Sequence, residues 1–264
     1  MWKIVRKIPN FKGKIRLFKF FNLTPSESVL LKLGKIKILV PNTIEPIGYS
    51  LLIDGIYEKE TIQFIVKNVP KNGVFVDVGA NIGTISIFVA KMRPDIKVIS
   101  FEPSFYNYSF LRLNKQLNNL SNITLVNAAV HLDGGKEISF FNNKVRNGGS
   151  SLCNDDKSQI EEIVKTVNLD NYFQLNNLIV NLIKVDVEGF ELTVLKSAQK
   201  HLNTTQPIIV FEFEDWAEKR SGDRIGSSQK FLLDSGYNLF SMNGNQVHQI
   251  LETGSHMLVA KKNS

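Results

Sequence analysis

The sequence predicts an α/β fold, in which a mostly parallel sheet carries helices on both faces. From Val74 onward, short apolar runs rich in β-branched residues alternate with longer, helix-compatible segments. Strands that alternate with helices are typical of a parallel sheet covered on both sides. Of the 264 residues, 43% are hydrophobic, which is enough to build a substantial core. No run of about 18 or more apolar residues occurs, so we expect no membrane-spanning helix.

The expected elements follow from their residue patterns. The first core strand, Val74–Val78, is a short apolar run of the kind found in buried parallel strands. Further strands are expected at 97–101, 123–126, 182–187 and 207–212, with helices at 84–92, 106–117 and 191–198 between them. A helix near 227–233 precedes two expected C-terminal strands, near 237–241 and 257–261.

Two segments interrupt this alternation and suggest the domain organisation. Residues 1–60 comprise a basic N-terminal arm and a lead-in with one strand candidate, Ile36–Val40, whereas residues 61–264 form the expected main domain. Within that domain, residues 130–170 contain two Gly-Gly pairs and short apolar patches. Such patches separated by turn residues predict a hairpin-like insertion around 130–170, placed to shape a pocket.

The net charge of +7 arises entirely from the N-terminal arm. Seven of the 32 basic residues lie in residues 1–22, which hold no acidic residue, so the remaining chain has 25 basic and 25 acidic residues. A balanced body disfavours nucleic-acid binding, which needs a basic surface. The arm mixes basic and large apolar residues, a composition that can dock on an anionic membrane. Because Pro9 and Gly13 interrupt an amphipathic helix, we favour packing on the domain, with peripheral membrane contact as the alternative.

The cysteine content and the N-terminal arm indicate the cellular compartment in which the protein is expected. The single cysteine, Cys153, excludes an internal disulfide framework and a cysteine-built metal site, and we interpret it as an incidental thiol. No residue spacing demands a metal ion, so none is expected. The arm lacks the continuous apolar stretch of a signal peptide. We therefore expect a cytoplasmic protein, with which one free thiol is compatible.

The strongest local pattern is a strand-to-helix turn that reads Asp77-Val78-Gly79-Ala80-Asn81-Ile82-Gly83. Glycine is needed where the backbone turns sharply or approaches a ligand closely. Because ligands of open α/β sheets lie at the carboxyl ends of the strands, we expect a ligand at this turn. The dinucleotide fingerprint is G-x-G-x-x-G, but Asn81 stands where its central glycine would be. The Asp77 carboxylate favours a cationic ligand, such as S-adenosylmethionine (SAM), over a pyrophosphate.

Glu102 ends the next strand, in Phe101-Glu102-Pro103. An acidic residue at this place can accept hydrogen bonds from both ribose hydroxyls of a nucleoside. Dinucleotide enzymes use an acid at a similar place, so Glu102 supports a nucleoside ligand but does not distinguish SAM from a dinucleotide. The structural alternatives are a capping aspartate at Asp77 and an exposed loop acid at Glu102. They are less favoured because the two acids end adjacent strands.

More acidic residues follow the later strands, in Lys184-Val185-Asp186-Val187-Glu188 and at Glu212. Strand alternation would put Lys184, Asp186 and Glu188 on one side. A charged lysine in an apolar strand is costly unless it is paired, so a lysine–carboxylate pair is the conservative interpretation. The functional interpretation places Asp186 at the ligand or the acceptor. The side chains that could act as a general base here are Asp186, Glu188 and Glu212, with His131 as a weaker candidate.

Four segments together resemble the FkbM family of SAM-dependent methyltransferases: VFVDVGANIGTIS, SFEPS, NAAV and IKVDVEGFELTVL. Gly55–Glu58 and Asn168–Asp170 are similar to that family as well, and the resemblance covers about residues 50–215. It implies a Rossmann-like class I methyltransferase fold with a seven-stranded sheet. It also implies O-methyl transfer to a hydroxyl of a sugar, glycan or natural product. With Gly83 of the turn, the implied SAM contacts are Asp77, Gly79, Asn81, Glu102, Asn127, Ala128 and Asp186.

The sequence is also compatible with two other classes of protein. An NAD-dependent oxidoreductase could use a similar sheet, although Asp77 and Asn81 argue against it. A catalytically silent binding module, anchored on a membrane by its basic arm, is the second. Asp77, Glu102 and Asp186 argue weakly against that alternative, because a silent module has no need of them.

Overall fold

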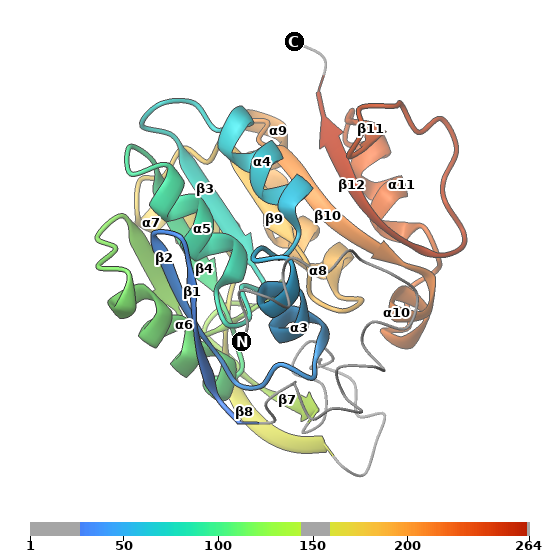
Figure 1. Cartoon of the computed structure of the whole chain (residues 1–264). Helices are drawn as coiled ribbons and strands as arrows, with labels where there is room; N and C mark the ends of the chain where they lie inside the picture. The colour runs from blue at the N-terminus through green and yellow to red at the C-terminus, as the bar shows by residue number, and fades with distance from the viewer. Residues whose placement is uncertain (1–26, 144–158, 263–264) are drawn as a thin grey trace.

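The computed structural model describes residues 27–143 and 159–262, and a seven-stranded sheet forms its centre (Figure 1). The strand order is β11-β12-β10-β9-β3-β4-β5. The parallel strands are β3 (Val74–Val78), β4 (Lys97–Phe101), β5 (Ile123–Val126), β9 (Leu182–Val185) and β10 (Ile208–Glu214). β12 (Ser255–Lys261) runs antiparallel between β10 and β11 (Asn238–Ser241). The predicted α/β fold with a mostly parallel, seven-stranded sheet is confirmed.

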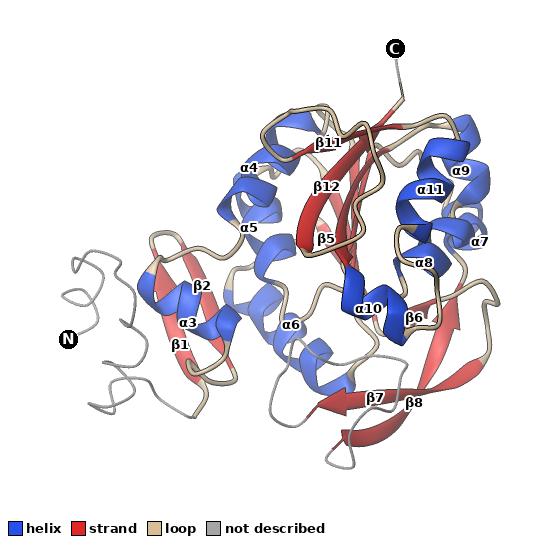
Figure 2. Cartoon of the chain, turned by 90° about the vertical axis from the view of Figure 1, so that its right-hand side faces the viewer, coloured by secondary structure: helices blue, strands red, loops and turns tan. Residues whose placement is uncertain are grey.

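Helices cover both faces of this sheet (Figures 1 and 2). One face carries α4 (Lys59–Asn68), α5 (Thr84–Met92) and α6 (Phe105–Leu117), and the other carries α7 (Leu169–Leu175), α8 (Glu191–Ser197), α9 (Gln199–Thr204) and α11 (Ser227–Asp234). Successive strand residues enter opposite cores, because side chains alternate along a strand: Phe75 packs in the first core and Val76 in the second. Burial on both sides explains why the central strands are continuous apolar runs.

The lead-in packs against the same core as α4 and α5. β1 (Val29–Leu33) and β2 (Ile36–Val40) form an antiparallel hairpin, and α3 (Pro46–Ile53) follows. Their buried apolar residues join the core that contains Phe75. Asn114 of α6 (Phe105–Leu117) and Asn118, the C-cap of that helix, hold the hairpin: Asn114 Oδ1 accepts from Leu39 N at 2.7 Å, and Asn118 Oδ1 accepts from Lys37 N at 2.9 Å. The chain is therefore anchored before it reaches α4.

A second, three-stranded sheet lies where the hairpin-like insertion is expected. It consists of β6 (Ala129–Val130), β8 (Gln159–Val167) and β7 (Glu137–Asn143), in the order β6-β8-β7. Figure 2 shows β7 and β8 running along the lower edge of the molecule. Glu162 of β8 accepts a hydrogen bond from Phe105 N, the first residue of α6, at 3.1 Å. This contact ties the second sheet to the start of α6, in the connection that follows β4.

Some expected boundaries differ from those observed. The strand expected at 182–187 ends at Val185, and Glu188 adopts a left-handed φ of 56°. The expectation that alternation puts Lys184, Asp186 and Glu188 on one side of a strand is therefore wrong, because the chain turns before Glu188. The sequence patterns also did not predict α3, α4, α7, α9 and α10 (Asp215–Arg220).

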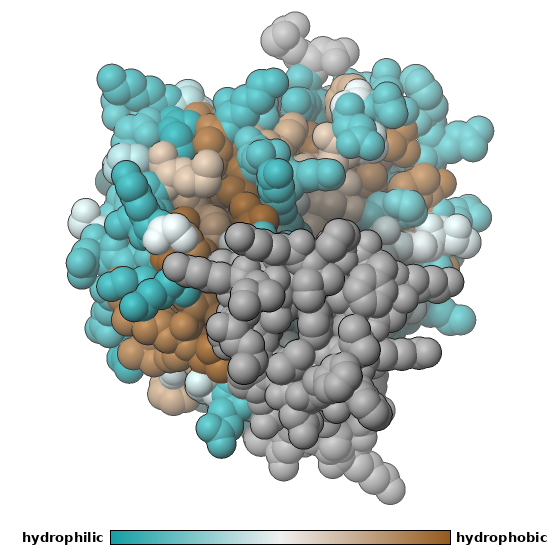
Figure 3. Space-filling model, viewed as in Figure 1, coloured by the Kyte–Doolittle hydropathy of each residue, from teal (hydrophilic) through white to brown (hydrophobic). Residues whose placement is uncertain are grey.

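The surface of the described residues is mostly hydrophilic on the face in Figure 3, with apolar residues gathered at its lower left. Exposed apolar side chains of the elements at that side include Leu30 of β1 and Leu113 of α6. Within residues 27–143 and 159–262, no helix is long and apolar enough to cross a membrane. The basic arm, residues 1–22, and Cys153 lie outside the described residues.

Candidate active site

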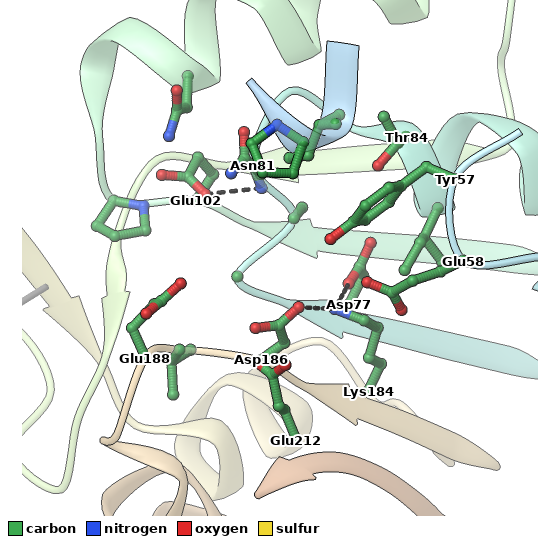
Figure 4. Close-up of a pocket in the computed structure, with 18 of the residues that line it drawn as sticks. Tyr57, Glu58, Asp77, Asn81, Thr84, Glu102, Lys184, Asp186, Glu188 and Glu212 are labelled. Carbon is green, nitrogen blue, oxygen red and sulfur yellow. Dashed lines mark hydrogen bonds and ion pairs between the residues drawn. The ribbon is translucent and has the colours of Figure 1, made fainter. Parts of the chain in front are cut away.

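A cavity of about 410 Å³ opens at the carboxyl ends of β3, β4, β9 and β10 (Figure 4). Small-molecule sites commonly measure about 300–1,000 Å³. The lining combines the turn after β3, the ends of the neighbouring strands and part of the lead-in. The lining includes Tyr57, Glu58, Asp77, Gly79, Asn81, Glu102, Lys184, Asp186, Glu188 and Glu212. The structure therefore brings together most of the predicted site residues.

The turn after β3 is built for close backbone approach. Gly79 has a φ of 81°, and a Cβ added there would lie 1.8 Å from the carbonyl oxygen of Asp186. No side chain fits in that gap, so glycine is required on steric grounds as well as for its φ. Asn81 is also left-handed, with a φ of 53°, and its N–H donates to Glu102 Oε2 at 2.8 Å. The turn and the end of β4 thus form one continuous wall.

Glu102 is only 4% exposed, and its carboxylate is held by backbone groups. Oε2 accepts from Asn81 N, and Oε1 accepts from Ser104 N at 2.9 Å. Burial raises the pKa of Glu102 to about 7, although these backbone hydrogen bonds act in the opposite direction. Each carboxylate oxygen can accept more than one hydrogen bond, so Glu102 retains capacity for a ligand hydroxyl.

Lys184 lies at the base of the cavity and is 2% exposed. Its Nζ lies 2.8 Å from Asp186 Oδ2 and 3.9 Å from Asp77 Oδ1. Burial disfavours the ammonium, but the nearby carboxylates of Asp186, Asp77 and Glu58 outweigh it and raise the pKa of Lys184. The lysine–carboxylate pair expected from the sequence is therefore present. Asp77 is 1% exposed and also accepts a hydrogen bond from Ser86 Oγ at 2.5 Å.

Asp186 and Glu212 form a hydrogen-bonded pair of carboxyl groups. Burial and the adjacent Asp186 charge raise the pKa of Glu212 to about 10. Burial opposes the ionisation of Asp186, but Lys184 and the hydrogen bond from Glu212 hold its pKa below the usual range. Like charges in contact cannot both ionise cheaply, so the pair carries one proton near neutral pH, on Glu212.

Glu188 lies in the turn after β9, across from this pair (Figure 4). Its carbonyl oxygen accepts from Arg220 Nη2 at 2.7 Å, which fixes the turn. Burial, followed by the nearby negative charge of Asp186, raises the pKa of Glu188 to about 8. Glu188 is therefore mostly neutral at pH 7 and can donate or accept a hydrogen bond.

Several sequence-predicted residues do not line the main cavity. Asn127 is exposed, and its Nδ2 donates to the carbonyl oxygens of Glu102 and Pro103 at 2.8 and 2.9 Å. Ala128 lines a smaller cavity of about 40 Å³. Gly83 precedes α5, where an added Cβ would lie 2.3 Å from Leu111 Cδ1. His131 lies outside both linings, and its Nδ1 accepts from Asp133 N at 3.2 Å.

Other lining residues carry no local sequence signal for a site. Tyr57 and Glu58 come from the turn before α4, Phe140 from β7 and Trp216 from α10. They reach the cavity through tertiary packing of segments that are remote from the glycine turn. The single hint is the Gly55–Glu58 resemblance, which assigns no role. Among the described residues, no group of three or more His, Cys, Asp or Glu side chains is arranged to hold a metal ion.

Comparison with known proteins identifies the family. Residues 77–251, more than half of the chain, match the Methyltransferase FkbM domain. Methyltransferase sdnD of Sordaria araneosa is 28% identical over 244 residues, which cover 76% of this chain and 91% of the relative. Methyltransferase 1 of Beauveria bassiana is 25% identical over 189 residues, with 63% and 72% covered.

Among solved structures, the FkbM methyltransferase of Methylobacillus flagellatus has a TM-score of 0.47 and 19% identity. The aligned region covers 72% of this chain and 43% of that one, so this chain spans less than half of its length. The family assignment rests on the domain match, which begins at the glycine turn. Methyl transfer from SAM, rather than hydride transfer to NAD, follows from that match. The chain belongs to the FkbM family of methyltransferases, with SAM as the methyl donor.

Proposed function

We propose that this protein transfers the methyl group of SAM to a hydroxyl of a sugar, glycan or natural product. The observation that carries the proposal is the position of Asp186 and Glu212 in the cavity lining, with Asp186 Oδ2 2.8 Å from Lys184 Nζ. A hydroxyl acceptor must lose a proton, and an ionised carboxylate at hydrogen-bonding distance can take it. The relatives named above are methyltransferases, and their names specify no acceptor.

The cavity fits the donor at several points. Gly79 leaves the backbone open to a ligand, and Glu102 offers carboxylate oxygens at the end of β4, where ribose hydroxyls would be held. Asn81 fixes Glu102, and Asn127 fixes the backbone that follows it, so both act as positioning residues. Ala128 lines the small apolar cavity next to Gly79. Gly83 permits α5 to begin against Leu111.

Transfer of the methyl group to the acceptor would involve Asp186, Glu212 and Glu188. SAM supplies an electrophilic methyl group whose carbon–sulfur bond breaks as the acceptor oxygen bonds to carbon, with the electron pair leaving on sulfur. Asp186, ionised by Lys184, accepts the hydroxyl proton, and Glu212 holds Asp186 in place through their hydrogen bond. Glu188, across the cavity, orients the acceptor. Alignment of this kind can supply several kcal/mol of the rate enhancement.

Substitution of Asp186 and Glu212, the carboxyl groups proposed to act on the acceptor, gives a first prediction. Asp186→Asn is expected to lower kcat about 10²–10³-fold, because the proton acceptor is lost. Glu212→Gln preserves a hydrogen-bond donor to Asp186 and should cost only about tenfold. The assay is transfer of labelled methyl from SAM to purified sugar, glycan and natural-product fractions. Glu137→Gln, a change on exposed β7, serves as the matched control and should keep full turnover. Full turnover in both Asp186→Asn and Glu212→Gln would rule out this role.

Glu102 gives a second prediction, about pH. Only the ionised carboxylate can accept hydrogen bonds from ribose at full strength, and its pKa is about 7. The affinity for S-adenosylhomocysteine (SAH) should therefore be highest above about pH 8 and fall toward about pH 5.5. Glu102→Gln should bind more weakly at about pH 8 and approach the wild type at about pH 5.5. Calorimetric titration across this range checks it, and a constant ratio between the two proteins would count against it.

We propose a cytoplasmic enzyme, because a chain with a single cysteine is compatible with a reducing compartment. The seven basic residues of residues 1–22 support either packing on the domain or peripheral contact with an anionic membrane.

A further inference from the structure

Two buried carboxylate oxygens in the cavity have no hydrogen-bond partner in the described part of the chain. They are Glu58 Oε2 and Asp77 Oδ1, and both residues line the cavity. Buried polar atoms are nearly always hydrogen-bonded, and leaving one unsatisfied costs about 1–3 kcal/mol. Two such atoms facing one cavity indicate a ligand group that donates hydrogen bonds to both.

Glu58 is held in place by an unusual backbone conformation and by its neighbours. It has a φ of 45° and ψ of 55° immediately before α4, a left-handed conformation that is costly for a residue with a side chain. Burial raises the pKa of Glu58, and the neighbouring hydroxyls of Thr61 and Tyr57 act in the opposite direction. Figure 4 shows Tyr57 and Glu58 pointing toward Asp77 and Lys184 from the segment opposite β9. Strain of this kind persists where the surrounding structure enforces it, often at a ligand site.

The charges around these oxygens favour a cation. Lys184 is the one lysine or arginine among the described residues that line the cavity. Three carboxylates act on its ammonium, those of Asp186, Asp77 and Glu58. Asp186 takes the short contact at 2.8 Å, and burial raises the pKa values of Asp77 and Glu58, so one ammonium leaves a deficit of positive charge around these carboxyl groups. A second ammonium group would balance it.

We propose that Glu58, together with Asp77, binds the α-ammonium group of the methyl donor. An ammonium has three N–H donors, enough to satisfy both orphaned oxygens. The sulfonium of SAM is also a cation, but it has no N–H and cannot satisfy them. The inference rests on SAM being the donor. It assigns a binding role to a turn that lies before residue 77, where the family match begins.

Two ligands that differ in the amino-acid moiety test this assignment without an acceptor. SAH carries the α-ammonium, whereas 5′-methylthioadenosine keeps the adenosine and the thioether but lacks it. By calorimetry, Glu58→Gln should weaken SAH binding roughly tenfold to a hundredfold and change methylthioadenosine binding less than about twofold. Tyr57→Phe should show the same selectivity with a smaller loss. Glu60→Gln, an exposed carboxyl change in the first turn of the same helix, should leave both affinities unchanged.

The other outcomes overturn the proposal. Equal weakening of both ligands in Glu58→Gln would show a general structural role, and unchanged SAH binding would show that the ammonium lies elsewhere. Urea unfolding of each variant accompanies the titrations, and Glu58→Gln should be at least as stable as the wild type, because it removes a buried charge. A wild-type chain that binds methylthioadenosine as tightly as SAH contradicts the ammonium site but not the donor. A wild-type chain that binds neither contradicts both.

Discussion

Replacing Gly79 with alanine is expected to destabilise the protein by roughly 3 kcal/mol or more and to abolish SAH binding. The added Cβ would lie 1.8 Å from the carbonyl oxygen and 2.9 Å from the carbonyl carbon of Asp186. Both atoms belong to backbone that leaves β9, so the conflict cannot be relieved by a side-chain rotation. β3 and β9 would have to separate at the point where the cavity begins.

Gly135→Ala provides the matched control for this substitution. Gly135 has a φ of 80°, close to the 81° of Gly79, but an added Cβ there would meet nothing within 4 Å. Its cost is therefore the left-handed conformation alone, about 1–2 kcal/mol. Urea unfolding and SAH calorimetry on both variants separate backbone strain from the clash. If the two variants lost equal stability and both bound SAH normally, the close approach of Gly79 to Asp186 would play no part.

Lys184→Met is expected to lower the free energy of unfolding by about 3–5 kcal/mol at about pH 8. The substitution keeps the length of the side chain but removes the ammonium that faces Asp186, Asp77 and Glu58. Asp186 and Asp77 are within 4 Å of this ammonium in the structure, and Asp77 is 1% exposed. Breaking a buried pair leaves uncompensated charge, which is costly in a poorly hydrated site.

The pH dependence of the free energy of unfolding of Lys184→Met distinguishes uncompensated buried charge from lost packing. Without Lys184 the buried carboxyls would titrate above their unfolded pKa values, so the folded state would bind more protons than the unfolded state. Stability then falls as pH rises, and the deficit of Lys184→Met should be largest at about pH 8 and shrink toward about pH 5. Lys230→Met, in an exposed pair with Asp234, should cost less than about 0.5 kcal/mol. A deficit of Lys184→Met that does not vary with pH would point to packing.

The central strands are the part of the fold that local sequence predicts best. Val74–Val78, Lys97–Phe101 and Ile123–Val126 have the expected boundaries, because each is an apolar run closed by loop residues. Helix α4 lacks a start signal: its N-cap is the left-handed Glu58 rather than Ser, Thr, Asp or Asn. α10 follows β10 without a gap and has six residues, too few for a periodic pattern.

The candidate site, like the fold, is predicted only in part by local sequence. Local patterns place Asp77, Gly79 and Glu102 at adjacent strand ends, since parallel strands present their carboxyl ends at one edge. They do not show that Ser86 and Lys184 lie beside the Asp77 carboxylate, or that Glu58 approaches it from the lead-in. These contacts join segments far apart in the chain and depend on tertiary packing. The preference of Asp77 for a cationic ligand therefore depends on the wider charge balance around Lys184, which local sequence does not show.

The attachment point of the transferred methyl group tests the central claim most directly. The protein is incubated with SAM labelled with ¹³C in the methyl group and with fractionated hydroxyl-bearing sugars, glycans and natural products. The labelled product is then isolated and examined by NMR. We predict a methyl ether, formed in equal amount to SAH and lost in Asp186→Asn. A label attached to nitrogen or carbon, or a methyl ether formed equally well by Asp186→Asn, would contradict the account.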